Sequence, residues 1–128
     1  MIINAPDVLA EVKTVFARYE KALAENDITT LDSLFHQTPE TVRYGVGENL
    51  YGAAQIAAFR QNRQGGSPER VVLRTAIATY GLDFATTNIE FKRIGGDVTG
   101  RQSQAWVRTE AGWQIVSAHV SLMGKKEG

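Results

Sequence analysis

Arginine side chains gather in the middle of the sequence among apolar residues, at positions Arg43, Arg60, Arg63, Arg70, Arg74 and Arg101. A guanidinium offers parallel N–H donors that match the two oxygens of a carboxylate, so arginine suits the recognition of small carboxylated compounds. Many surface arginines only cover apolar area with their stems. We therefore expect two or three of the six to line a binding site.

Arg43 lies in a short strand predicted over residues 41–45, between two residues whose side chains point the other way. It is either a surface residue of an edge strand or a clamp on a substrate carboxylate, and we favour the clamp. Glu48 follows in the next short segment, where it could position a water or simply pair with an arginine.

A helix predicted over residues 53–63 places Arg60 and Arg63 on the same stripe as Ile56 and Phe59. Arginine is rarely buried, so two guanidiniums on an inward stripe are unusual. Either arginine could bind a second carboxylate, and Arg63 could equally reach solvent at the helix end.

Residues 100–123 form two runs of alternating character around a short turn with Gly112, which predicts a β-hairpin. Strict alternation in the second run puts Val116, Ala118, Val120 and Leu122 on one face and Trp113, Ile115, Ser117, His119 and Ser121 on the other. We expect the second face to form a pocket wall that is apolar at Trp113 and polar at His119 and Ser121.

His119 is one of only two histidines, and it either lines the pocket or is a structural residue of the sheet. On the preceding strand, Arg101 and Ser103 share one face, and Gln102, Gln104, Trp106 and Arg108 share the other. The alternation alone does not decide which of these faces looks inward. We include Arg101 and Ser103 among the candidate ligand contacts.

The first predicted helix begins after Asn4, which we expect to cap it, and carries an apolar stripe of Leu9, Val12, Phe16, Tyr19 and Leu23. Tyr19 is therefore either a core tyrosine or a pocket residue. In a pocket, its hydroxyl could donate a proton to a leaving nitrogen or orient a water, but unaided it is not a strong base.

Helical patterns precede the long strands in this sequence. A second helix is predicted over 28–35 and a short strand over 48–51, followed by long strands over 70–80, 83–94, 98–109 and 113–123. Helices followed by antiparallel strands indicate an α+β fold. We expect a cone-shaped, curved antiparallel sheet wrapped around the N-terminal helices, with one open end.

The chain has 128 residues, which predicts a single domain over residues 1–128. Its 14 basic and 14 acidic residues give no net charge, so we expect no nucleic-acid partner, and no apolar run predicts a membrane span. The absence of cysteine excludes thiol chemistry and suits a cytoplasmic location. Two distant histidines support no metal site, and no sequence motif indicates a cofactor.

Several motifs resemble the AtzH-like family, whose relatives include HpxZ-type proteins of oxalurate catabolism, within the SnoaL-like (nuclear transport factor two-like) superfamily. They are RYGVGE (43–48), GAAQIAAFR (52–60), DFATT (83–87), GRQSQAWVR (100–108) and the ending WQIVSAHVS (113–121). The resemblance implies a cystatin-like α+β barrel, a homodimer and a small polar substrate. It also implies that Tyr19 on the first helix works with Arg43 on the first strand.

This resemblance favours a cofactor-independent hydrolase that cleaves a C–N bond in a small carboxylated urea or amide. The alternative is a non-catalytic subunit that binds a metabolite for a separate amidase. An isomerase or dehydratase would need a carboxylate or histidine base, and the inward faces of the first two predicted helices show no Asp or Glu. Apolar residues on both faces of the last strand also predict a dimer.

Overall fold

The computed structural model describes residues 1–124 and contains every predicted element, with ends shifted by a few residues. The helices are α1 (Pro6–Glu25), α2 (Ile28–Ser33) and α3 (Ala53–Asn62). The strands are β1 (Val42–Tyr44), β2 (Asn49–Tyr51), β3 (Arg70–Tyr80), β4 (Phe84–Arg93), β5 (Thr99–Thr109) and β6 (Gly112–Leu122). The predicted α+β class is confirmed.

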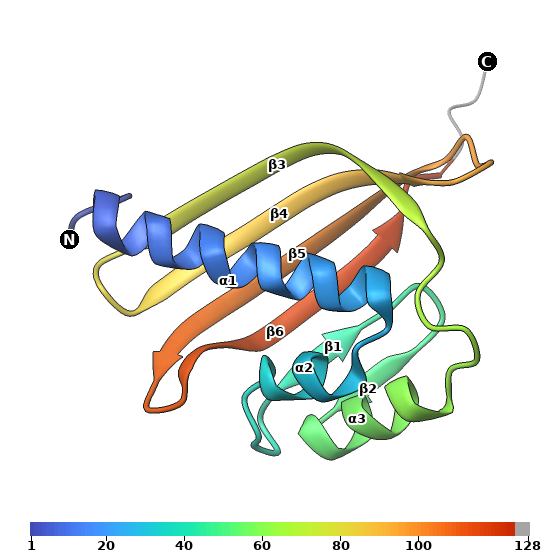
Figure 1. The fold of residues 1–128 in the computed structure, drawn as a ribbon, viewed down its shortest axis with the longest axis horizontal. Coiled ribbons are helices and arrows are strands. Elements are labelled where there is room, and N and C mark those ends of the chain that lie inside the picture. The colour runs from blue at the N-terminus through green and yellow to red at the C-terminus, as the bar shows by residue number, and fades with distance from the viewer. Residues whose placement is uncertain (125–128) are drawn as a thin grey trace.

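The strands form a single sheet in the order β2-β1-β6-β5-β4-β3. The four long strands are antiparallel neighbours, as predicted, whereas β1 runs parallel to β6 with Arg43 opposite Ala118. All three helices lie on one face of this curved sheet, with α1 across the long strands and α2 and α3 near β1 and β2 (Figure 1). We call the covered face the inner face and the opposite one the outer face.

A β-bulge in β6 changes which residues point inward. Trp106 pairs with Ile115 and Ala105 pairs with Ser117, so Val116 has no partner on β5. The extra residue reverses the alternation, and Trp113 and Ile115 therefore share the buried inner face with Ala118. The predicted strict alternation through residues 113–121 is wrong for this reason.

The inner face packs on a stripe of α1 formed by Val8, Val12, Phe16, Tyr19 and Ala22. Val8, rather than the predicted Leu9, begins this stripe. Asn4 is not the helix cap: it has a φ of 58°, and its side chain accepts a hydrogen bond from the Thr79 amide at 2.8 Å. This bond ties the start of the chain to β3, so it fixes α1 over the sheet.

Polar side chains are also buried between α1 and the sheet. The Trp106 indole donates to Thr87 Oγ1 at 2.9 Å, and the Thr87 hydroxyl donates to Gln104 Oε1 at 2.9 Å. These bonds place Gln104 and Trp106, together with Gln102, on the inner face of β5. Over residues 1–124, no helix combines the length and apolar character needed to cross a membrane.

Candidate functional site

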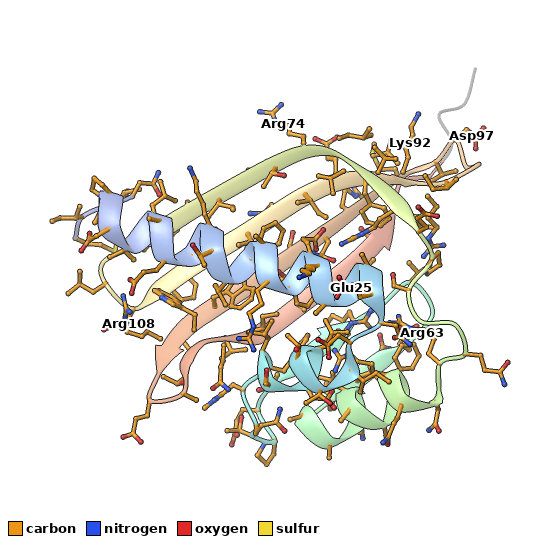
Figure 2. The ribbon with its side chains drawn as sticks, in the orientation of Figure 1. Glu25, Arg63, Arg74, Lys92, Asp97 and Arg108 are labelled. Atoms are coloured by element: carbon orange, nitrogen blue, oxygen red, sulfur yellow. The ribbon has the colours of Figure 1, made fainter. Side chains whose placement is uncertain are left out.

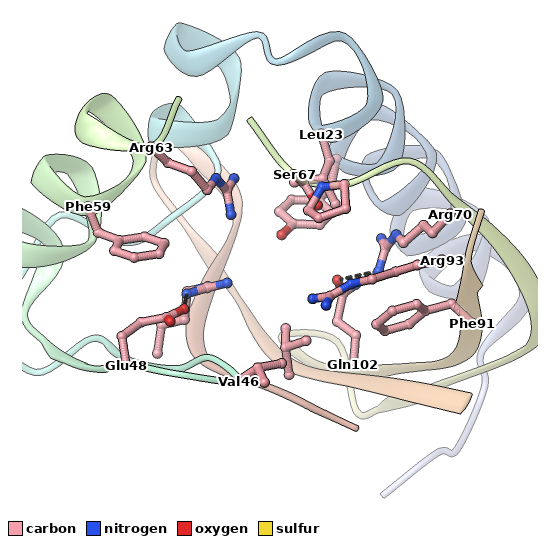
Figure 3. A pocket seen from close by; sticks show the side chains of 14 residues that line it. Leu23, Val46, Glu48, Phe59, Arg63, Ser67, Arg70, Phe91, Arg93 and Gln102 are labelled. Atoms are coloured by element: carbon pink, nitrogen blue, oxygen red, sulfur yellow. Dashed lines mark hydrogen bonds and ion pairs between the residues drawn. The ribbon is translucent and has the colours of Figure 1, made fainter. Parts of the chain in front are cut away.

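A cavity of about 190 Å³ lies between the C-terminal half of α1, the β1–β2 turn, the end of α3 and the inner face of the sheet. Ligand pockets for drug-sized molecules usually measure about 300–1,000 Å³, so this cavity favours a smaller ligand. Four arginines line it, namely Arg43, Arg63, Arg70 and Arg93. Tyr19 and Glu48 line it as well, and Figure 3 shows the labelled side chains converging from opposite walls.

The β1–β2 turn forms one wall and holds an ion pair. Arg43 Nη1 donates to Glu48 Oε1 at 2.8 Å, and the other carboxylate oxygen accepts the Gly47 amide at 3.2 Å. Gly45 allows this contact because a Cβ there would lie 1.6 Å from Glu48 Oε1. Glycine is thus needed where the carboxylate crosses the turn.

A second ion pair forms the opposite wall. Arg70 Nη2 donates to both carboxylate oxygens of Glu20, at 2.8 and 2.7 Å. Arg70 Nη1 also donates to Gln102 at 3.2 Å, and the Gln102 amide donates to Glu20 at 3.4 Å. The Arg70 guanidinium lies over the Phe91 ring, 4.8 Å from its centroid, so its position is fixed on every side.

Arg63 is half-buried without such support. Its guanidinium carbon lies 5.6 Å from the centre of the Phe59 ring, and the guanidinium carbon of Arg43 lies 5.5 Å from the same centre. Its Nε is buried and has no hydrogen-bond partner in residues 1–124. Burial lowers the pKa of Arg63, the charges of Arg43 and Arg60 lower it further, and Tyr19 and Glu48 raise it. Arg63 is therefore a cation short of solvation, as an anion-binding group would be.

Tyr19 is 5% exposed, and its ring packs against Phe35 and Trp106 with centroids 6.4 Å away in both cases. Its hydroxyl has no hydrogen-bond partner within the described chain, and the cavity is the space that it borders. Because Tyr19 lines the cavity, a ligand or water there can hydrogen-bond to its hydroxyl.

Of the predicted site residues, the structure brings Tyr19, Arg43, Glu48 and Arg63 together around the cavity. Arg60 lies elsewhere: it is 5% exposed, pairs with Asp32 and stacks over the Phe35 ring. It joins α3 to α2, and the shared stripe that suggested a ligand contact reflects this ion pair.

The other predicted ligand contacts, Arg101, Ser103, His119 and Ser121, lie on the outer face and do not line the cavity. The bulge at Val116 turns His119 and Ser121 outward. On β5, Ser103 pairs with His119 and Arg101 pairs with Ser121, so these two residues lie on the same outer face, which the sequence had left undecided. The exposed His119 ring instead packs edge-on against Tyr44, with centroids 5.6 Å apart. Arg74 also points away from the sheet, as Figure 2 shows.

Sequence reasoning missed Glu20, Arg93 and Gln102 as members of the site. Glu20 contradicts the expectation that the first helices turn no acid inward, because it follows Tyr19 directly and reaches Arg70. Arg93 could have been found from the sequence, because it lies two residues after Phe91 on β4 and so faces the same side of the sheet. Within residues 1–124, no three His, Asp or Glu side chains gather as a metal site requires.

Comparison with known proteins places this geometry in a family. A model of the AtzH-like family matches residues 1–126. The chain is 52% identical to a protein with unknown function from Pectobacterium atrosepticum, covering 95% of each chain with a TM-score of 0.93. It is 44% identical to a cystatin-like fold protein from Burkholderia xenovorans, covering 98% of this chain and 99% of that one, with a TM-score of 0.93.

A nuclear transport factor 2-like superfamily protein from Salmonella enterica shares 28% identity over 94% of both chains, with a TM-score of 0.75. These similarities confirm the SnoaL-like, cystatin-like α+β fold. No curated protein matches the chain.

Proposed function

Because the chain belongs to the AtzH-like family, we propose that its pocket binds a small carboxylated nitrogen compound and hydrolyses one of its C–N bonds without a cofactor. Carboxylated ureas, amides and oxalurate are the substrate class. The observation that carries the proposal is the unpartnered Tyr19 hydroxyl beside a small, arginine-lined cavity.

The charge of the cavity supports an anionic ligand. Among residues 1–124, four guanidiniums line it, whereas only two carboxylates, Glu48 and Glu20, are bonded to them. The wall therefore keeps an excess of positive charge in partly buried surroundings, where charge–charge interactions are stronger than in water. Phe59 and Phe91 also line the cavity, and aromatic side chains suit a flat, conjugated compound such as a urea.

In the proposed reaction, water adds to the carbonyl carbon and the C–N bond breaks. The Tyr19 hydroxyl donates its proton to the leaving nitrogen, and a proton from the water restores the phenol. The excess positive charge of the arginine-lined wall stabilises the negative charge that develops on the carbonyl oxygen. An amide gives a carboxylic acid and an amine or ammonia, a urea gives a carbamic acid and an amine or ammonia, and cleavage of the oxalyl–nitrogen bond of oxalurate gives oxalate and urea.

One observation favours the alternative, a binding subunit that serves a separate amidase. Hydrolysis needs a group that takes the proton of the attacking water. Within residues 1–124, Glu48 is the one carboxylate that lines the cavity, and it is bonded to Arg43 and the Gly47 amide. A pocket equipped to bind but not to turn over its ligand would have this arrangement.

The test is hydrolysis of oxalurate and carboxylated ureas by the wild type and by Tyr19→Phe, with Tyr44→Phe on the outer face as the matched control. We expect turnover to fall roughly 10²-fold or more in Tyr19→Phe, at an unchanged melting temperature. Equal turnover by Tyr19→Phe and wild type would refute the role of the hydroxyl. Binding without any turnover by the wild type would establish the accessory subunit instead.

The homodimer remains part of the proposal, on different residues from those first considered. Trp113 and Ile115 are buried in the inner face, so their side chains offer no apolar surface to a partner. The outer face is not covered by any described helix (Figure 1) and carries Val71, Tyr51 and Phe84, which are 51%, 55% and 38% exposed. A second copy would cover these side chains.

A further inference from the structure

The four pocket arginines differ in how they are already engaged. Arg43 is held by Glu48, whose second oxygen is fixed by the turn. Arg70 is held by Glu20 and Gln102 in a closed ring of three side chains. Their side chains are 13% and 11% exposed, so neither guanidinium is free to reorient toward a ligand without breaking an existing ion pair.

Arg63 and Arg93 have no such partner. Within residues 1–124, no hydrogen bond or ion pair engages either guanidinium, and both line the cavity. Figure 3 shows them entering it from opposite walls, Arg63 beside Phe59 and Arg93 beside Phe91. Their charges are therefore available, whereas those of Arg43 and Arg70 are largely neutralised.

We propose that Arg63 and Arg93 bind the anionic oxygens of the ligand, and that Arg43–Glu48 and Arg70–Glu20 form charge-neutral walls that position it. This inference rests on the proposed function for the nature of the ligand. Arg93 then becomes a specificity-determining residue. The carboxylate-binding role that the sequence assigned to Arg43 passes to Arg63 and Arg93.

An anion between the two free guanidiniums would supply the missing partners. It would accept hydrogen bonds from Arg63, whose buried Nε lacks a partner within residues 1–124. The ion pairs Arg43–Glu48 and Arg70–Glu20 have a different role. Each pair is already complete, so it shapes the cavity wall without adding net charge.

The test is calorimetric titration with oxalurate in the Tyr19→Phe background, where the expected loss of turnover keeps consumption of the ligand low. We expect Arg63→Gln and Arg93→Gln each to weaken binding roughly 10- to 100-fold, the range for losing a hydrogen bond to a charged group. The matched control is Arg74→Gln on the outer face, which should bind like the parent protein.

Charge-neutral double variants test the two ion pairs without leaving an unpaired carboxylate. Arg43→Gln with Glu48→Gln, and Arg70→Gln with Glu20→Gln, should weaken binding less than threefold. Melting curves confirm that each variant is folded. If either double variant loses as much affinity as Arg63→Gln, or if Arg63→Gln and Arg93→Gln bind like the parent, the assignment is wrong.

A second probe, inorganic phosphate, separates this inference from the proposed function. Binding of phosphate but not oxalurate, with the same dependence on Arg63 and Arg93, would leave the arginine assignment standing and overturn the substrate class. Binding of neither anion by the parent protein would overturn both.

Discussion

Replacing Gly45 by alanine should detach Glu48 from Arg43. The added Cβ would fall 1.6 Å from Glu48 Oε1, 2.4 Å from its carboxyl carbon and 3.0 Å from Arg43 Nη1, so the carboxylate must move away. All three atoms belong to side chains, so the backbone of the turn can stay in place.

The size of the effect follows from what that carboxylate does. A hydrogen bond to a charged group contributes about 1.5–3 kcal/mol. Glu48 is 24% exposed, so water compensates part of the loss. We expect the free energy of unfolding to fall by about 1 kcal/mol, which corresponds to roughly 3–5 °C in melting temperature for a chain of this length.

Thermal unfolding of Gly45→Ala beside Gly47→Ala measures this loss. Gly47 lies in the same turn, and a Cβ there would meet nothing within 4 Å, so Gly47→Ala reports the general effect of exchanging glycine for alanine. The reasoning is refuted if the two variants melt alike. It is also refuted if Gly45→Ala is equally destabilising when Glu48 is already alanine, because the cause would then lie in the backbone.

Three further outcomes are expected. Thr87→Val should lower the free energy of unfolding by about 2–3 kcal/mol, because Trp106 and Gln104 lose their buried partner. Thr86→Val on the outer face should change it little, and urea denaturation of both variants measures the difference. The hydrogen bond from Arg108 lowers the pKa of Glu11 below its ordinary 4.5, so this pair stabilises the fold above that pH and the stabilisation is lost as pH falls through the lowered pKa. Glu11→Gln should therefore show a shallower loss of stability below about pH 4.5 in urea titrations, and an unchanged slope would contradict this. Light scattering at micromolar concentration should give the mass of a dimer, and a monomer mass would argue against the outer-face interface.

The order and class of the elements followed from sequence because each carries a long, regular pattern. The α1 stripe through Val12, Phe16 and Tyr19 and the alternation of β4 and β5 repeat over several turns or pairs, so single exceptions do not obscure them. Tyr19, Arg43, Glu48 and Arg63 were likewise expected at the site, with the pairing of Tyr19 and Arg43 taken from the family resemblance, and all four line the cavity.

What failed depended on information that spacing does not carry. The bulge at Val116 inserts one residue without any glycine or proline to mark it, and this moved His119 and Ser121 to the outer face. The partner of Arg60 is Asp32, and that of Arg70 is Glu20, on elements far away in the sequence. Only the packing of α1 and α2 against the rest of the chain decides which arginines are already paired.

The parallel pairing of β1 with β6 has a consequence for how the pocket is assembled. Val42 pairs with Ser117 and Tyr44 with His119, so three consecutive contacts join parts of the chain that are far apart in sequence. Closing so long a loop is slow and costs conformational entropy, and a strand of three residues forms few hydrogen bonds to offset that cost. We therefore expect the wall that carries Arg43 and Glu48 to be the last part of the sheet to form during folding. We also expect it to open before the four long strands do, which would give a ligand a route into the cavity.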